Sequence, residues 1–155
     1  MAPPAPPKPG FMNLALAAAQ AAAEAGEVPV GAVLVDPADN TVIATAGNRT
    51  RRDNDPTAHA EMLVIREAAA RLGAERLGGL DLHVTLEPCA MCAGAISLAR
   101  LRRVYYAAPD PKGGAVDHGP RFFAQATCHH QPEVYAGIEE VAAAELLRGF
   151  FRARR

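Results

Sequence analysis

The chain has 155 residues and a formal net charge of −1, and half of its residues are hydrophobic, many of them alanine. A chain of this length forms one domain that buries about two-thirds of its unfolded surface. The near-neutral charge excludes a general polyanion-binding protein, so any nucleic-acid contact must come from local patches. Three cysteines are too few for the disulfide framework of a small secreted protein.

The first ten residues contain five prolines and lack the apolar core of a signal peptide. We therefore expect residues 1–10 to form a disordered tail and residues 11–155 to form the folded domain. No apolar run is long enough to span a bilayer. These features favour a cytoplasmic protein without a membrane partner.

The first part of the domain predicts a helix and a strand hairpin. An alanine-rich helix runs from Phe11 to Ala25 and is closed by Gly26. Val28 to Val35 is apolar and β-rich, which fits a buried strand. After a turn at 36–40, Thr41 to Ala46 is expected to return as an antiparallel strand.

The rest of the domain alternates helices and strands. The predicted elements are a helix from Pro56 to Arg71, a strand from Asp81 to Glu87, a helix from Cys89 to Ala99, a strand from Arg103 to Ala108, a strand from Glu133 to Gly137 and an amphipathic helix from Ile138 to Arg154. Residues 113–132 are irregular, with at most a short helical turn. This alternation predicts a layered α/β fold whose sheet is partly parallel.

Two short motifs predict a metal site. Cys89 and Cys92 lie three positions apart where a helix begins, so both face the same side, and the helix dipole favours their thiolates. About thirty residues earlier, His59 and Glu61 lie at the start of another helix. We expect His59, Cys89 and Cys92 to bind zinc, whose tetrahedral site keeps a fourth position for water. Such an open position indicates catalysis.

The charge of this site gives Glu61 a role. Zinc with two thiolates and a neutral imidazole has no net charge, so it polarises water less strongly than zinc held by three histidines. Such a centre gains more from a nearby base. We expect Glu61 to take a proton from the water and return it to the substrate.

Other interpretations of the cysteines stay open at this point. Cys128, beside His129 and His130, could complete a closed, structural Cys3His zinc site. Cys89 and Cys92 could instead form a redox pair, although that would leave the His-Ala-Glu motif without a role.

Two arginine-rich segments could contact RNA. One surrounds Phe150 and Phe151; the other lies in the loop after residue 47. Their members are Arg148, Arg152, Arg154 and Arg155, and Arg49, Arg51 and Arg52. Arginine beside aromatic rings suits phosphate contact with base stacking. Equally, the two phenylalanines could belong to the core and the arginines to a solvated helix face.

Several other residues favour structural roles. His83 lies within a predicted strand, where a hydrogen-bonded core histidine is more common than a ligand. His118, His129 and His130 are expected at the surface. Met62 and Met91 are expected to pack rather than to contact substrate. Tyr105 and Tyr106 alternate on one strand, so one could face the core and the other the cleft.

The motifs together resemble a known family. His-Ala-Glu followed by Pro-Cys-x-x-Cys is the signature of the zinc-dependent nucleobase deaminases, a pattern established for these enzymes. The sequence is further similar to the bacterial tRNA-specific adenosine deaminases over roughly residues 11–155. The matching segments are 27–35, 47–49, 55–61, 84–96, Asp110-x-Lys112 and the Phe150-Phe151-Arg152-x-Arg154 ending. The turn at 36–40 and residues 115–131 depart from the family pattern.

The resemblance implies a three-layer α/β/α, cytidine deaminase-like fold with a central mixed sheet of about five strands. It implies one zinc per chain, held by His59, Cys89 and Cys92, with a bound water or hydroxide. Glu61 would be the catalytic residue, and Asn48, Asp110 and Arg152 would bind substrate.

The implied reaction is hydrolysis of the wobble adenosine in a tRNA anticodon loop to inosine, with release of ammonia. Attack occurs at C6 of adenine while Glu61 protonates N1 and then the departing amine. An anticodon loop already exposes its bases, which lowers the cost of extrusion. The implied partners are a tRNA, with arginine tRNA expected, and a second copy of the chain in a homodimer.

Two rival functions share parts of this pattern. A deaminase of free guanine or cytosine, or of their nucleosides, carries the same zinc signature. A non-catalytic, zinc-stabilised RNA-binding module would not need Glu61. The segments outside the signature, such as 27–35 and the arginine-rich ending, favour the RNA enzyme.

Overall fold

The computed structural model describes residues 10–154. The proline-rich tail expected at residues 1–10 therefore falls, except for Gly10, outside the described residues. The helices are α1 (Phe11–Glu24), α2 (Ala60–Leu72), α3 (Ala90–Ala99) and α4 (Glu140–Arg152), with one 3-10 turn, η1 (Phe122–Ala124). The strands are β1 (Gly31–Asp36), β2 (Thr41–Gly47), β3 (Asp81–Leu86), β4 (Arg103–Ala108) and β5 (Glu133–Ala136).

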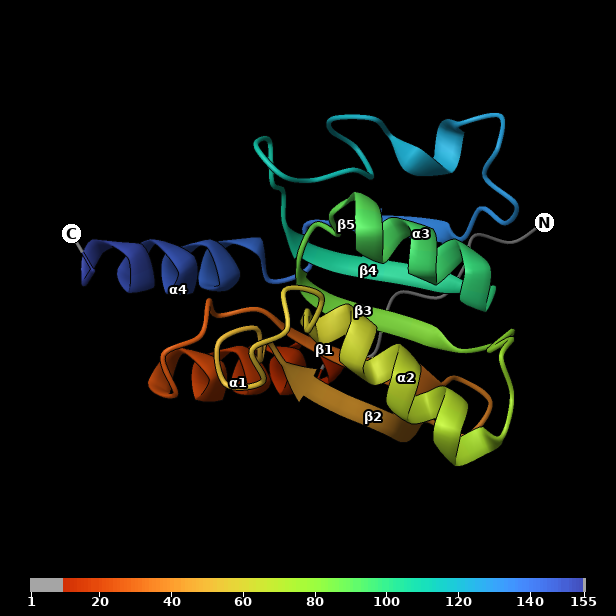
Figure 1. Ribbon diagram of the computed structural model, residues 1–155, viewed down its shortest axis with the longest axis horizontal. Coiled ribbons are helices and arrows are strands. Elements are labelled where there is room, and N and C mark those ends of the chain that lie inside the picture. The colour runs from red at the N-terminus through yellow and green to blue at the C-terminus, as the bar shows by residue number, and fades with distance from the viewer. Residues whose placement is uncertain (1–9, 155) are drawn as a thin grey trace.

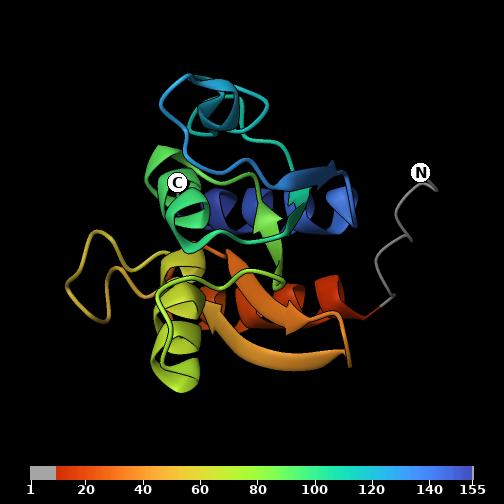
Figure 2. The same ribbon diagram turned by 90° about the vertical axis from the view of Figure 1, so that its right-hand side faces the viewer.

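The five strands form one mixed sheet in the order β2-β1-β3-β4-β5. β1 pairs antiparallel with both β2 and β3, whereas β3, β4 and β5 run parallel to one another. Helices α2 and α3 cover one face of the sheet, and α1 and α4 cover the other (Figures 1 and 2). The expected three-layer arrangement with a mixed, five-stranded sheet is confirmed.

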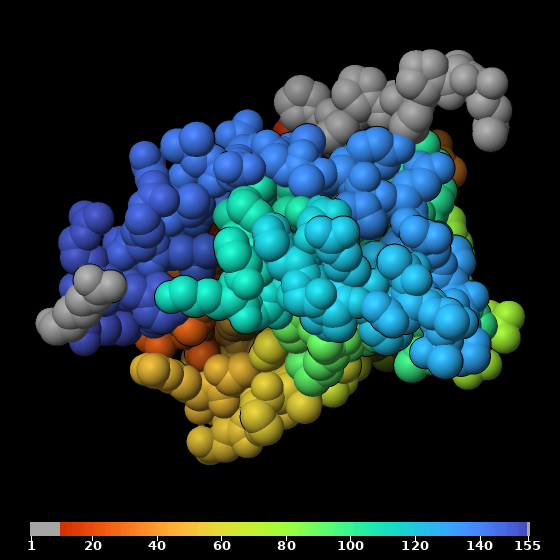
Figure 3. Space-filling view, turned by 90° about the horizontal axis from the view of Figure 1, so that it is seen from above, coloured from red at the N-terminus to blue at the C-terminus, as the bar shows by residue number. Residues whose placement is uncertain are grey.

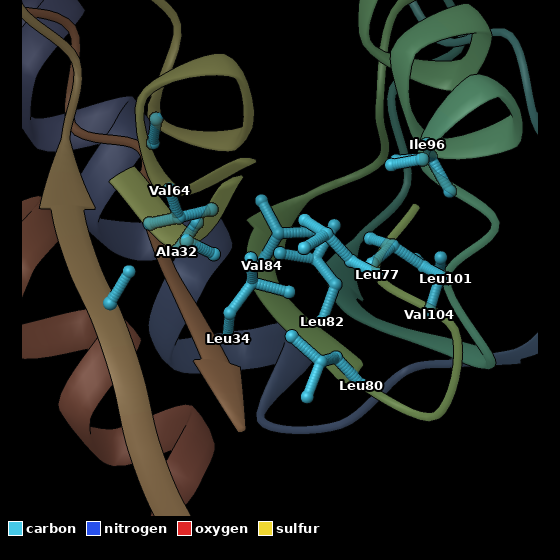
Figure 4. Close-up of a cluster of buried hydrophobic side chains, with 14 of the residues drawn as sticks. Ala32, Leu34, Val64, Leu77, Leu80, Leu82, Val84, Ile96, Leu101 and Val104 are labelled. Carbon is cyan, nitrogen blue, oxygen red and sulfur yellow. The ribbon is translucent and has the colours of Figure 1, made fainter. Parts of the chain in front are cut away.

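The larger core lies between the sheet and the α2–α3 layer (Figure 4). Val64 of α2 and Ile96 of α3 are fully buried there against side chains from three strands, Leu34, Leu82, Val84 and Val104. Burying such aliphatic side chains contributes about 1.5–3 kcal/mol each to folding. This layer fixes the N-terminal ends of α2 and α3 relative to the strands, and those helix ends carry the candidate ligands.

The opposite face is packed with smaller side chains. Ala15, Ala19 and Ala22 of α1 are buried against the sheet. Gly31 allows this close approach, because a Cβ at that position would overlap the carbonyl oxygen of Ala15. The alanine content of the first helix therefore reflects a tight helix–sheet contact.

Most predicted boundaries agree with the structure to within two residues, but one strand start and one helix start were wrong. β1 begins at Gly31 rather than Val28, because the Val30 N–H donates to the Val28 carbonyl at 2.8 Å and closes a tight turn around Pro29. Helix α2 begins at Ala60 rather than Pro56, for a reason given below. Among the described helices, none combines the length and apolarity needed to cross a bilayer.

Candidate active site

Three potential metal ligands from two helix starts lie together. The Nδ1 atom of His59 is 3.6 Å from the Sγ atoms of both Cys89 and Cys92, and all three donor atoms fall within 4.8 Å of one another. Zinc bonds of about 2.0 Å to nitrogen and about 2.3 Å to sulfur at a tetrahedral angle place those atoms about 3.5 Å apart. The spacing and the donor types therefore fit a zinc ion.

Local hydrogen bonds place His59 directly before α2. The carboxylate of Asp55 accepts the N–H and the hydroxyl of Thr57, which turns the chain away from helical geometry. His59 is the N-cap residue with an extended backbone, and its side chain does not cap the helix. Instead, the Oδ1 atom of Asn48 accepts the Ala60 N–H at 2.8 Å. Asn48 replaces the missing cap and frees the imidazole for a ligand.

Cys89 occupies the equivalent position before α3. Pro88 stops β3, and Cys89 is the extended N-cap of a helix whose first turn contains the buried Cys92. A hydrogen bond from Cys92 lowers the pKa of Cys89 to about 4, and the same contact raises the pKa of Cys92. A bound cation would favour the thiolate form of both cysteines and release their protons.

Glu61 lies in the first turn of α2 and is only 4 % exposed. Burial raises the pKa of Glu61 to about 7, and the neighbouring Cys89 thiolate acts in the same direction. A carboxyl group that both gains and loses its proton near neutral pH is suited to general acid–base catalysis.

The alternative ligands do not join this cluster. The Sγ atom of Cys128 lies 3.4 Å from the Ser97 hydroxyl and donates to the carbonyl of His130. His130 in turn contacts the Leu101 carbonyl through Nε2, and His129 is exposed. Within residues 10–154, only His59, Cys89 and Cys92 gather as a three-donor cluster. A closed Cys3His site is therefore not formed.

Two buried glutamates with no role predicted from the sequence support the loops beside the cluster. The side chain of Glu27 accepts N–H groups of Arg51 and Arg52 and so holds the loop that follows Asn48. Glu87 accepts N–H groups from residues 110–118. The one signal in the sequence was their position, because each lies at one end of an apolar predicted strand. A carboxylate that is buried there needs hydrogen-bond donors from other segments.

A groove of about 910 Å³ separates α4 from the end of β4. Leu86, three residues before Cys89, contributes to its wall together with Asp110 and Lys112. The α4 side supplies Arg148, Phe151, Arg152 and Arg154. Figure 3 shows residues 113–132 covering the middle and right of this face, to the right of α4, with α3 partly visible below them. The groove joins the predicted substrate residues Asp110 and Arg152, while Asn48 lies at the start of α2.

The aromatic residues of α4 divide between the two interpretations. Phe150 is buried, and the guanidinium of Arg154 stacks 3.5 Å from its ring centre. Phe151 is 49 % exposed and lines the groove. One phenylalanine is therefore a core residue, and the other is available to a ligand.

Three structural expectations need correction. His83 is a core residue, but its buried Nδ1 atom has no hydrogen-bond partner among the described residues; the ring stacks on Tyr105 instead. Tyr105 and Tyr106 are both buried, on opposite faces of the sheet, so neither faces an open cleft. His118 and His130 were expected at the surface, but both are only partly exposed. The Nδ1 atom of His118 lies 2.7 Å from Glu87, and the Nε2 atom of His130 lies 2.7 Å from the Leu101 carbonyl oxygen.

Comparison with known proteins places this site among deaminases. The profile of the "Cytidine and deoxycytidylate deaminase zinc-binding region" matches residues 8–108. The tRNA-specific adenosine deaminase of Agrobacterium fabrum is 63 % identical over 145 residues, which cover 94 % of each chain. The corresponding protein of Bacillus subtilis is 45 % identical over 94 % of this chain and 89 % of its own length.

Solved structures agree with this result. A structure described as a study of A-to-I editing by tRNA:A34 deaminases at the wobble position has a TM-score of 0.88 and 62 % identity. The match covers 90 % of this chain and 100 % of that one. A guanine deaminase from Bacillus subtilis has a TM-score of 0.60 and 44 % identity; the match covers 64 % of this chain and 62 % of that one.

Proposed function

Because this chain belongs to the cytidine and deoxycytidylate deaminase zinc-binding family, and within it to the tRNA-specific adenosine deaminases, we propose that it deaminates a tRNA. The reaction is hydrolysis of the wobble adenosine of an anticodon loop to inosine and ammonia. The observation that carries the deamination chemistry is the three-donor cluster of His59, Cys89 and Cys92 beside the buried Glu61. The tRNA substrate is supported by the 63 % identity to a tRNA-specific adenosine deaminase.

His59, Cys89 and Cys92 hold one zinc ion per chain in this proposal, and their donor types and spacing support it. When bound, zinc supplies an activated water as the nucleophile toward C6 of adenine. Three protein donors are consistent with a water as the fourth ligand.

Glu61 moves the protons of the reaction. Its pKa of about 7 lets it take a proton from the nucleophilic water at neutral pH. It then delivers that proton to N1 of adenine. A second proton, taken from the hydroxyl group formed at C6, goes through Glu61 to the departing amine as the C6 carbonyl forms. The burial of Glu61 keeps bulk water from competing for these transfers.

Asn48, Asp110 and Arg152 bind the RNA in this proposal. The Oδ1 atom of Asn48 is used by the Ala60 N–H, so its amide nitrogen is the group that donates to the flipped nucleotide. Asp110 and the exposed Arg152 flank the groove beside α4, which suits nucleotides next to the target base.

The proposal includes a homodimer, a cytoplasmic location and arginine tRNA among the substrates. The relatives' names support the tRNA substrate; the homodimer and the arginine tRNA are proposed from the family resemblance of the sequence. The location follows from that of the tRNA substrate.

Inosine formation tests the proposal directly. The zinc-loaded protein should release ammonia from a tRNA with adenosine at the wobble position far faster than from free adenosine, guanine or cytidine. Inosine sequencing of the treated tRNA should place the product at that single position. Faster turnover of free guanine would support the alternative, a free-base deaminase, which the partial similarity to a guanine deaminase makes the relevant rival.

A further inference from the structure

The loop of residues 110–118 is folded around one buried carboxylate. The Oε2 atom of Glu87 accepts the N–H groups of Val116, Asp117 and His118 at 3.1, 2.9 and 3.1 Å. Its Oε1 atom accepts the Asp110 N–H at 3.0 Å and lies 2.7 Å from Nδ1 of His118. The Glu87 side chain has no exposed surface, so these donors replace its water.

Gly114 shows independently that the loop is shaped to this carboxylate. A Cβ at Gly114 would lie 2.5 Å from Cδ of Glu87 and 2.6 Å from the Asp110 carbonyl oxygen. The next residue, Ala115, donates its N–H to the Pro88 carbonyl at 2.9 Å. The loop backbone therefore approaches the carboxylate as closely as a residue without a side chain permits.

Glu87 connects two parts of the candidate active site. Along the chain it is two residues before Cys89, and its own N–H is bonded to the Ala108 carbonyl at 2.8 Å. Across space it holds the loop that carries Asp110 and Lys112 to the wall of the groove beside α4. Glu87 itself is not a member of the three-donor cluster. The hydrogen bonds of Glu87 therefore stabilise the wall of the groove and not the donor cluster.

We propose that Glu87 is a positioning residue for the RNA substrate: it fixes the 110–118 loop so that Asp110 and Lys112 meet the nucleotides beside the target base. His118 is a second contact from the same loop to the same carboxylate. This inference rests on the proposed tRNA function. Because the loop lies at the groove and not at the donor cluster, its displacement weakens substrate binding more than the chemical step.

The kinetic test replaces Glu87 by glutamine, which keeps the shape but presents an NH2 group to the loop's N–H donors. We expect KM for a wobble-adenosine tRNA to rise about tenfold, while kcat at saturation stays within about threefold and zinc content is unchanged. In Gly114→Ala, the added Cβ would clash with the Glu87 carboxylate and displace the loop, so KM should rise in the same way. His118→Ala removes one contact and should have a smaller effect.

Amide hydrogen exchange tests the same inference without activity. In Glu87→Gln, the amide keeps one acceptor oxygen and turns its NH2 group toward the other donors. The N–H groups of residues 116–118, or that of Asp110, should therefore exchange about tenfold faster. The N–H groups of Arg51 and Arg52, which Glu27 holds, should be unaffected. The exposed Glu75→Gln is the matched control and should change neither exchange nor KM.

The outcomes separate this inference from the function on which it rests. A wild-type protein that forms no inosine contradicts the proposed function. Unchanged loop exchange in Glu87→Gln contradicts the positioning role, whatever the activity. Loss of zinc, or a fall in kcat at constant KM, would overturn it as well, because Glu87 would then act on the ligand segment. If Glu87→Gln does not fold, Gly114→Ala decides by the same KM and exchange criteria.

Discussion

Glu61 and Glu87 are both buried glutamates beside the proposed zinc ligands, yet their surroundings are opposite. Glu61 is 4 % exposed and Glu87 is 2 % exposed. Burial raises the pKa of Glu61 to about 7. Burial alone would also raise the pKa of Glu87, but hydrogen bonds, first that from the Asp110 N–H, bring it below the usual value. The number of donors, not the depth of burial, distinguishes them.

This difference in hydrogen bonding indicates a different role for each carboxylate. A carboxylate that accepts several N–H groups stays ionised and organises the backbone that supplies them. A carboxylate buried with few donors binds a proton strongly enough to be partly protonated near pH 7, so it can both take and give a proton there, which suits catalysis. Glu27 resembles Glu87 in this respect, because the N–H groups of Arg51 and Arg52 donate to its carboxylate and stabilise the negative charge.

The largest effect on the chemical step alone is expected from Glu61→Gln. The variant keeps all three donor residues and the helix start, so it should bind zinc and fold like the wild type. It should lose about 10²–10⁴-fold in kcat for inosine formation, because an amide cannot exchange a proton at pH 7. Single-turnover inosine formation and metal content measure the two properties in one preparation.

Cys89→Ala is the matched contrast to Glu61→Gln. Removing this ligand should abolish both stoichiometric zinc and activity and should lower the thermal midpoint, since metal binding contributes to folding. A Glu61→Gln protein that keeps wild-type turnover would remove the distinction between the two carboxylates. A Cys89→Ala protein that keeps one zinc per chain would contradict the ligand assignment.

The metal cluster was predictable because each motif is short and its residues are unusual. A His-Ala-Glu and a Cys-x-x-Cys, each at a helix start, combine residue types that packing alone does not require there. The strands were equally accessible, since β4 is apolar and ended by a proline. In both cases, the information lies within a few residues of the element it specifies.

The features that were missed depend on contacts between distant segments. The start of α2 is set by the local turn at Asp55 together with the side chain of Asn48, twelve residues before Ala60. Pro56 alone therefore suggested too early a beginning. Glu87 is bonded to residues 23–31 positions later, and no local pattern reveals those donors. His83 was expected to form a hydrogen bond, but its ring instead contacts the rings of Phe11 and Tyr105. These two residues come from other elements, so the sequence of the strand that carries His83 does not reveal the contact.

An effect of intermediate size is expected at His83. It is a buried titratable residue whose Nδ1 atom has no hydrogen-bond partner among the described residues, and it is not part of the three-donor cluster. Burial lowers the pKa of His83 to about 4 from an ordinary value of 6.5. Between those values the unfolded chain binds a proton that the folded chain excludes, so stability falls as pH falls from 6.5 toward 4. The loss reaches about 3 kcal/mol, and His83→Phe should remove that part of the pH dependence.

Denaturant unfolding of the wild type and His83→Phe at about pH 7 and about pH 4.5 measures this difference. Phenylalanine can keep the stacking with Phe11 and Tyr105, which contact the ring in the wild type. Other groups titrate in both proteins, so the comparison between them isolates His83. Identical pH dependence in the two proteins would show that burial without donors does not control the charge at this position.

The smallest effect is expected from Arg152→Ala, because an exposed charge gains little from its surroundings. Loss of one phosphate contact should weaken tRNA binding about threefold and reduce the slope of log K against log salt by about 0.7–0.9. Filter binding at salt concentrations from about 50 to about 200 mM measures the slope. Arg76→Ala, an exposed arginine between α2 and β3, is the matched control. An equal slope in both variants would assign Arg152 to a solvated face, and the groove would then bind RNA through Lys112 and Arg148 instead.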